Sequence, residues 1–398
     1  MPWRETSAMN ERFNFVVDAQ RGHFPFAELC RRYGVSRKTG YKWLHRFEEH
    51  GPQGLADRSH RPHSCPHATP LEIVQAILEL RRRRGWGAPK LQRLLQDRFP
   101  KRPPPTVGTI HRILDRHGLV LPKRRRLRRA HPGRPTTPID QPNAVWSADF
   151  KGQFRLRNSL YCYPLTVQDG FSRFLLGCQG LTAPTIEGSR PVFERLFREY
   201  GLPQRIRTDN GAPFASNALG RLSTLSVWWV RLGILPELIE PGQPQQNGRH
   251  ERMHKTLKAR TTRPPERNLR AQQRRFDAFL HEFNHERPHE ALGQEPPASA
   301  YQPSDRAFPR KLPPLEYPAH FEVRRVSRNG GIRWYTRWIN VSHLLGEQYV
   351  GFEEIDDSLW EVYFGPVKLG RFHEQEGNIE DHYGRKTRHQ RRKVSPIR

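Results

Sequence analysis

The sequence predicts a multidomain protein with all-α units first, an α/β core second and a small β domain last. Its 398 residues exceed what one ordinary hydrophobic core accommodates. Apolar residues recur every three or four positions up to about residue 120, and at every second position from about residue 144. Pro-rich stretches at 122–140 and 303–318 separate these regions.

The chain is strongly basic. It has 68 Lys and Arg against 40 Asp and Glu, a net charge of +28 and a pI near 10.8. This charge favours a polyanionic partner. No apolar run approaches the roughly 20 residues of a membrane span, and the first residues lack the apolar centre of a secretory signal, so we expect an intracellular protein.

Cysteine usage argues against a disulfide scaffold. The four cysteines lie far apart and form no CxxC pair, so reduced thiols are expected. A cluster of potential zinc ligands does occur in a Pro-rich linker, at His60, His63, Cys65 and His67. It lacks a second ligand pair at zinc-finger spacing, so a plain linker is the favoured interpretation.

Residues 24–51 have the pattern of a helix, a tight turn and a second helix, within a domain predicted at 10–54. Gly34 suits the turn and Ser36 suits the cap of the second helix. The basic residues expected on the outer face of that helix are Arg37, Lys38, Lys42 and Arg46. We interpret this face as entering a DNA groove; the alternative is a helical bundle with a solvated basic face.

A second helix-turn-helix unit is predicted at 70–121, with helices near 71–84, 88–99 and 106–120. Thr106 is the expected cap of the third helix. The connector at 122–140 is basic and Pro-rich, and it includes Arg124, Arg125 and Arg126. It is interpreted as chain that tracks DNA phosphates or as a solvated tether.

The region 141–302 is predicted to be a layered α/β domain, because three strands are followed by alternating helices and strands. The expected strands are 144–156, 160–170, 172–180, 204–209 and 234–240, and the expected helices are 185–200 and 216–232.

Three acidic residues in this domain point to a metal site. Asp149 lies inside the first strand, Asp209 ends the fourth, and Glu251 begins a helix after a Pro/Gly/Gln-rich loop, with Asn247 as its expected cap. Carboxylates that converge on one edge repel one another, and a divalent cation such as Mg²⁺ relieves that repulsion.

Other acids fit less well. Asp169 precedes Gly170, which indicates a hairpin turn, so we exclude it from the site. Glu237 and Glu240 are rival third acids by position, but neither begins a basic helix after a flexible loop.

Four ordered motifs carry a resemblance to a known family: WSADFKG, RTDNGAPF, PGQPQQNGRHERMHKTLK and FNHERPHEALGQEPPASAY. Together they resemble the integrase core of bacterial DDE-type insertion-sequence transposases, which are related to retroviral integrases. The resemblance implies a ribonuclease H-like fold and a metal-binding catalytic triad of Asp149, Asp209 and Glu251. It also implies Mg²⁺ or Mn²⁺, with two ions per site, and DNA contacts by Lys255 and Lys258.

Two features depart from the family pattern. Between Asp209 and Glu251 lie 41 residues, more than in many relatives. Helix-turn-helix units also replace the N-terminal zinc module of retroviral integrases. Residues 319–376 alternate in short strands and resemble the small DNA-binding β-barrels of integrases, and a basic tail follows at 377–398.

The sequence therefore predicts a DNA transposase in the bacterial cytoplasm, associated with the nucleoid. We expect it to bind the terminal inverted repeats, cleave the 3′ ends and transfer them to target DNA as a homo-oligomer. The alternatives are a catalytically idle DNA-binding regulator and a nuclease of the same fold that cuts without joining.

Overall fold

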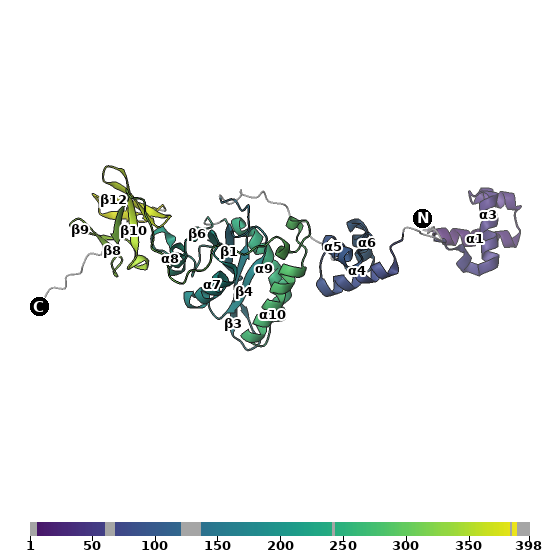
Figure 1. Cartoon of the computed structure of the whole chain (residues 1–398). Coiled ribbons are helices and arrows are strands. Elements are labelled where there is room, and N and C mark those ends of the chain that lie inside the picture. Colours follow the sequence, from purple (N-terminus) through teal and green to yellow (C-terminus); the bar gives the residue numbers. More distant parts are fainter. Residues whose placement is uncertain (1–5, 60–67, 121–136, 241–242, 383, 388–398) are drawn as a thin grey trace. The chain divides into compact units, whose positions relative to one another are not determined.

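The computed structural model describes residues 6–59, 68–120, 137–240, 243–382 and 384–387 (Figure 1). The chain divides into two compact units, Met1–Pro70 and Leu71–Arg398. The zinc-ligand cluster at 60–67 and the arginines at 124–126 lie outside the described residues, as does most of the basic tail. No helix in the described parts has the length and apolar character that a bilayer crossing requires.

The first unit is a three-helix domain of α1 (Ala8–Arg21), α2 (Phe26–Arg32) and α3 (Arg37–His50). The pair α2 and α3 is the helix-turn-helix expected from the sequence. Gly34 has a φ of +65°, and the Ser36 side chain caps α3 by accepting a hydrogen bond from the Thr39 N–H. A Cβ on Gly40 would lie 2.8 Å from the Cys30 Sγ, so glycine lets α3 approach α2 closely.

The second unit begins with α4 (Leu71–Arg84), α5 (Ala88–Arg98) and α6 (Val107–Arg116), close to the predicted bounds. Thr106 caps α6 as expected. Ion pairs join these helices to the following domain: Arg84 lies 3.3 Å from Glu282, and Arg93 lies 3.0 Å from Glu295.

The sheet of the α/β domain combines antiparallel and parallel strands. The strands are β1 (Val145–Phe150), β2 (Phe154–Arg155), β3 (Tyr161–Asp169), β4 (Leu175–Leu181), β5 (Arg205–Thr208) and β6 (Leu235–Leu238). Their order is β2-β3-β1-β5-β6, and β4 also pairs with β3. The strands β1, β3 and β4 are antiparallel neighbours, whereas β1, β5 and β6 run parallel. The single strand expected at 144–156 is thus two strands.

Helices cover both faces of this sheet (Figure 1). One core forms with α7 (Ile186–Tyr200) and α8 (Thr224–Arg231), the other with α9 (Gly248–Thr261) and α10 (Leu269–His281). Trp146 and Ala148 of β1 belong to the first core. Since side chains alternate along a strand, Ser147 and Asp149 face the opposite side, toward α9.

Two local predictions were wrong. The helix expected at 216–232 begins only at Thr224, because Gly220 has a φ of +62° and Ser223 forms a capping box with Ser226. Asn247 does precede α9, but its side chain makes no capping hydrogen bond.

The C-terminal domain is an antiparallel sheet with a separate hairpin. Its strands are β7 (Glu322–Arg325), β8 (Gly331–Trp334), β9 (Arg337–Asn340), β10 (Tyr349–Asp356), β11 (Leu359–Phe364), β12 (Val367–His373) and β13 (Asn378–Glu380). The main sheet has the order β13-β12-β11-β10-β7, and β8 pairs only with β9. A closed barrel is therefore not confirmed, because β13 and β7 remain edges of the sheet. Trp334 of the hairpin packs on Phe352 and Phe372.

The C-terminal domain packs on α8. Val230 of this helix and Leu219 belong to the same buried cluster as Leu369 and Phe372 of β12. The stretch 303–318, expected as a linker, is bound to the α/β domain: Arg306 donates hydrogen bonds of 2.7 Å to the carbonyls of Pro203 and Gly233.

Candidate metal centre

The three predicted acids are brought together by neighbouring elements. Asp149 lies near the end of β1, and Asp209 directly follows β5. Because β1 and β5 are parallel neighbours, both aspartates lie at the carboxyl edge of the sheet. Glu251 lies in the first turn of α9, the helix that the Asp149 side of β1 faces.

The electrostatics of Asp149 show the influence of the other two carboxylates. Burial, followed by the charge of Asp209, raises the pKa of Asp149 to about 7, and the charge of Glu251 adds to the shift. Lys151 and a backbone N–H oppose it. Asp149 is thus a carboxyl group in a low-dielectric setting with two acidic neighbours, and a cation would relieve the repulsion.

A pair of buried histidines lies behind Asp149. His250 and His254 are four residues apart on α9, so they occupy one helical face, and both are almost fully buried. Each Nε2 atom lies 2.7 Å from the Thr166 hydroxyl on β3. The sequence interpretation missed these histidines; their helical spacing around Glu251 was the available signal.

Hydroxyl groups hold both rings in place. The Thr166 hydroxyl contacts both Nε2 atoms and the Asp149 carbonyl, which lies 3.0 Å away. The Nδ1 atom of His250 lies 3.0 Å from the Ser147 hydroxyl, which also lies 3.3 Å from the Gln168 carbonyl. Burial lowers the pKa of His250 to about 3 and the pKa of His254 further still, so both rings are neutral.

The Nδ1 atom of His254 points at Asp149, whose Oδ2 atom lies 3.6 Å away. This contact is not an ion pair, because the ring is neutral. Among the described residues, the ligand atoms of Asp149, His250 and His254 lie within 4.8 Å of one another and could hold a metal ion. His250 has both nitrogens in hydrogen bonds, so Asp149 and His254 are the better donors. Carboxylate oxygens suit Mg²⁺ and Mn²⁺, whereas an imidazole nitrogen suits transition metals better than Mg²⁺.

The excluded acids have structural partners. Asp169 is buried and accepts hydrogen bonds from the backbone N–H groups of Asn143 at 2.8 Å and Ser172 at 2.7 Å. Glu237 forms an ion pair of 2.7 Å with Arg207. Both acids therefore stabilise the scaffold.

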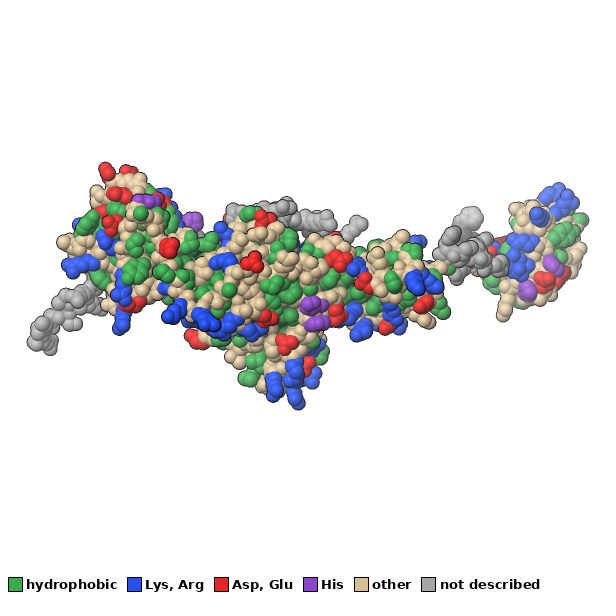
Figure 2. Space-filling view, viewed as in Figure 1, with side chains coloured by type: hydrophobic (Ala, Val, Ile, Leu, Met, Phe, Trp, Pro, Cys, Tyr) green, Lys and Arg blue, Asp and Glu red, His purple; other side chains and the backbone are tan. Residues whose placement is uncertain are grey.

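The basic residues predicted to contact DNA lie mostly at the surface, where Lys and Arg side chains are abundant (Figure 2). The exposed ones are Arg37, Lys38, Lys42, Lys255 and Lys258. Arg46 is half-buried, and its guanidinium lies 5.0 Å from the centre of the Trp43 ring. Their contact with DNA remains a prediction.

Family models match most of the described domains. The integrase core domain matches residues 139–244 and 232–297 in two models. A helix-turn-helix domain matches 11–63, and a homeodomain-like domain matches 39–114. The chain is therefore similar to helix-turn-helix domains over its first helices and to an integrase core over residues 139–297.

Two insertion-element proteins are similar to this chain. The uncharacterized 39.2 kDa protein of insertion element IS476 from Xanthomonas euvesicatoria is 28% identical, over 62% of this chain and 69% of that protein. The uncharacterized 31.7 kDa protein of IS407 from Burkholderia multivorans is 28% identical, over 48% of this chain and 66% of that protein. The chain thus spans about two thirds of the length of both relatives. Both comparisons make the chain similar to proteins of bacterial insertion elements.

Solved retroviral structures also align with the chain. The HTLV-2 integrase catalytic core domain in complex with magnesium has a TM-score of 0.33 and 16% identity, over 41% of this chain and 98% of that one. A chain of the simian T-cell lymphotropic virus intasome has a TM-score of 0.36 and 16% identity, over 73% of this chain and 97% of that one.

Proposed function

We propose that this protein is a DNA transposase that binds the terminal inverted repeats of a mobile element, cleaves its 3′ ends and joins them to target DNA. The observation that carries the proposal is the proximity of Asp209 and Glu251 to Asp149: burial, followed by the charges of these two acids, raises the pKa of Asp149 at the carboxyl edge of the sheet. Uncompensated acids at such an edge are suited to a divalent cation and a phosphate group.

In this proposal Asp149, Asp209 and Glu251 hold Mg²⁺ or Mn²⁺, with two ions per site. Bound cations would lower the pKa of an attacking water or 3′ hydroxyl and stabilise the leaving oxygen. The protein itself orients the acids: Thr166 binds the Asp149 backbone, and the Gly211 N–H donates to Asp209 at 3.2 Å. His254 limits the positions open to the Asp149 carboxylate.

The surrounding modules supply DNA contacts. On α9, Lys255 and Lys258 follow Glu251 by four and seven residues, so they extend the same helical face along the bound end. The α3 helix, with Arg37, Lys38 and Lys42 exposed, reads the terminal repeat. The C-terminal sheet acts as the DNA-binding domain that the sequence predicted as a barrel. Two ends must be processed together, so the active form is a homo-oligomer.

The test is a strand-transfer assay with a labelled duplex from the DNA flanking the gene, a supercoiled target and Mg²⁺ or Mn²⁺. Glu251→Gln keeps the shape of the side chain but removes its charge. We expect it to lower joining by more than about 100-fold, since even outer-shell changes at metal sites cost about 10- to 100-fold. Glu187→Gln is the matched control, because Glu187 is exposed in the first turn of α7.

Each outcome separates the proposal from its alternatives. Joining by wild type and Glu187→Gln, with end binding but no joining by Glu251→Gln, supports a transposase. Nicking without joined products indicates a nuclease. Binding by all three proteins without any metal-dependent product indicates a DNA-binding regulator.

A further inference from the structure

A basic groove runs beside Glu251 and joins the helical unit to the α/β domain. Its volume is about 1220 Å³, and its wall includes Lys90 of α5, Arg173 of the turn between β3 and β4, Arg252 of α9, and Arg287 after α10. The volume exceeds the roughly 300 to 1,000 Å³ of small-molecule pockets, so an extended ligand fits it better.

The charge of this groove is unbalanced. Six Lys or Arg residues line it, against three acids, one of which is Glu251. One of the six, Arg207, is already paired with Glu237. Lys90 donates its hydrogen bond to the Pro288 carbonyl, and Arg173 donates at 2.8 Å to the Gly170 carbonyl. These backbone contacts orient the cations without neutralising them.

The cations act on one another across the groove. Burial, and then the charge of Arg287, lowers the pKa of Lys90 to about 8. Burial, and then the charge of Arg249, lowers the pKa of Arg173 to about 10, and Arg252 adds to this shift. Partly buried like charges raise the free energy of the empty protein, and a bound polyanion reverses that effect.

His289 supplies a second observation in favour of a ligand in the groove. It lines the groove, and its Nε2 atom is buried without a hydrogen-bond partner among the described residues. Burial lowers its pKa to about 3, with Lys90 and Arg287 contributing, so the ring is neutral. A phosphate oxygen would satisfy an Nε2–H donor at this position.

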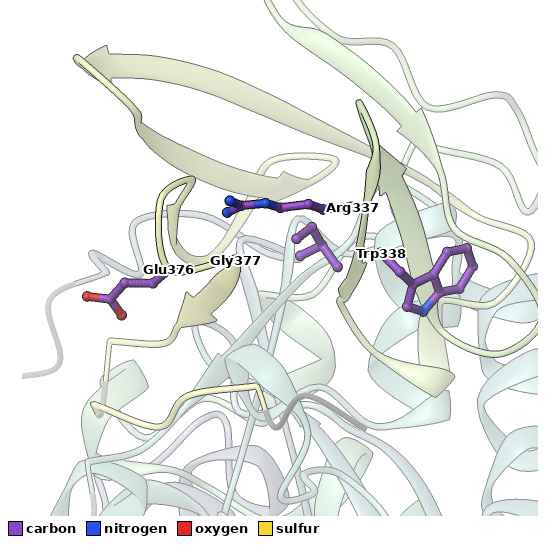
Figure 3. Close-up of a pocket in the computed structure, with 5 residues that line it drawn as sticks. Arg337, Trp338, Glu376 and Gly377 are labelled. Atoms are coloured by element: carbon purple, nitrogen blue, oxygen red, sulfur yellow. The ribbon is translucent and has the colours of Figure 1, made fainter. Parts of the chain in front are cut away.

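The smaller pocket of the C-terminal domain differs in these respects (Figure 3). Its volume is about 310 Å³, and Arg337 is its main cation. That guanidinium donates to the carbonyls of Glu374 and Gln375. No cluster of mutually repelling cations lies there among the described residues.

We propose that the groove binds the phosphodiester backbone of the DNA strand beside the scissile bond, through Lys90, Arg173, Arg252 and Arg287. The inference rests on the proposed function, because it names the polyanion as DNA. It assigns α5 a place in the wall of the catalytic groove, in addition to any role of the helical unit in reading sequence. The ion pair of Arg93 with Glu295 holds α5 in that place, and the ion pair of Arg84 with Glu282 holds the end of the neighbouring α4.

The experiment measures binding of an end duplex from the flanking DNA to full-length protein carrying Glu251→Gln, which separates binding from chemistry. Lys90→Gln is compared with Lys101→Gln, an exposed lysine of the same helical unit that does not line the groove. We expect Lys90→Gln to lower the slope of log K against log salt by about 1, and Lys101→Gln to leave it unchanged.

Neutral methylphosphonates placed singly along the strand locate the contact. In the Glu251→Gln protein, a methylphosphonate next to the 3′ end should weaken DNA binding several-fold. The added Lys90→Gln change should abolish this effect of the methylphosphonate. Thermal unfolding checks that the variants are folded. If Lys90→Gln does not fold, Arg252→Gln replaces it in the experiment, because Arg252 is exposed.

Equal salt slopes and equal methylphosphonate effects in all proteins would overturn the proposal, as would a sensitive phosphate far from the 3′ end. If wild type performs strand transfer but the methylphosphonate effect does not depend on Lys90, the transposase proposal stands and the proposed role of the groove is wrong. If the effect depends on Lys90 but wild type performs no strand transfer, the groove binds DNA and the transposase proposal is wrong.

Discussion

The Nδ1 atom of His254 lies 3.6 Å from the Oδ2 atom of Asp149, and the other nitrogen of the ring is held 2.7 Å from Thr166. The neutral ring therefore presents its Nδ1 atom to the carboxylate. A proton or a cation between these two atoms would stabilise the contact. This arrangement ties the histidine pair to the proposed metal site.

Thr166→Val tests that connection. The change removes the hydroxyl that hydrogen-bonds with both Nε2 atoms, and two buried ring nitrogens left unpaired should cost about 2 to 4 kcal/mol of unfolding free energy. Loss of ring orientation should lower Mn²⁺ affinity about 10- to 100-fold. Titration calorimetry and Mn²⁺ EPR measure the affinity, and denaturant unfolding measures the stability.

The matched control for Thr166→Val is Thr261→Val. Thr261 is also buried, but its hydroxyl donates to the Leu257 carbonyl at the far end of α9. It should reduce stability without changing Mn²⁺ affinity. If Thr166→Val bound Mn²⁺ as tightly as Thr261→Val, the histidine pair would have no part in placing Asp149.

Metal affinity should depend on pH through Asp149. Its pKa of about 7 lies above the usual value of about 3.9, so the metal-free protein keeps this proton near neutrality. A cation must displace the proton, so Mg²⁺ affinity should rise about tenfold per pH unit below 7 and level off above it. Calorimetry in buffers of different ionisation enthalpy should show proton release at pH 6 that is largely lost at pH 8.

The same shift sets the sign of metal-free stability. Between about pH 4 and 7 the unfolded chain has lost the Asp149 proton and the folded protein retains it, so this group's contribution falls as pH rises through that window. Asp209→Asn removes the largest charge that raises the pKa. The variant should move the window to lower pH, and an unchanged window would contradict the proximity of the two acids.

The sequence predicted the acidic residues of the site better than the residues that hold them in place. Asp149, Asp209 and Glu251 followed from strand periodicity and ordered motifs. Thr166 could not be found in this way, because its place opposite Asp149 depends on the register of β1 and β3. Only the spacing of His250 and His254 was visible, and buried histidines at helical spacing have many other uses.

Long-range packing explains the local errors in the predicted fold. Residues 216–223 have helical apolar spacing, yet Leu219 and Leu222 are buried against the C-terminal sheet, and Gly220 takes a positive φ beside Leu369. That partner surface is distant in the sequence. Strand alternation likewise predicted the C-terminal strands, but whether a sheet closes depends on pairing between its edges.

Asn284 should be a major support of the α/β domain. Its fully buried amide donates to the Leu175 carbonyl at 2.9 Å and accepts from the Leu175 N–H at 2.8 Å. Asn284→Ala leaves both backbone groups unpaired, and should lower the free energy of unfolding by about 2 to 4 kcal/mol. Urea unfolding measures the change. Exposed Asn217→Ala is the control and should be within about 0.5 kcal/mol of wild type.

The contact between α8 and the C-terminal domain should be separable from the α/β core. Val230 is buried in the cluster shared with that domain, whereas the adjacent Trp229 belongs to the core of the sheet. Val230→Asp places an unpaired charge in the shared cluster, which should destabilise packing there by several kcal/mol. Hydrogen exchange should then show lost protection in β10 to β12 and retained protection in β1 and β3.

Val323→Asp provides the control, because it adds the same charge at a position of β7 that is 40% exposed. It should leave exchange in both regions unchanged. Equal loss of protection in β1 and β12 of the Val230→Asp protein would instead show that the two domains unfold as one cooperative unit. In that case the C-terminal sheet would act as part of the catalytic scaffold, and DNA binding by this sheet could not be altered without affecting the acids.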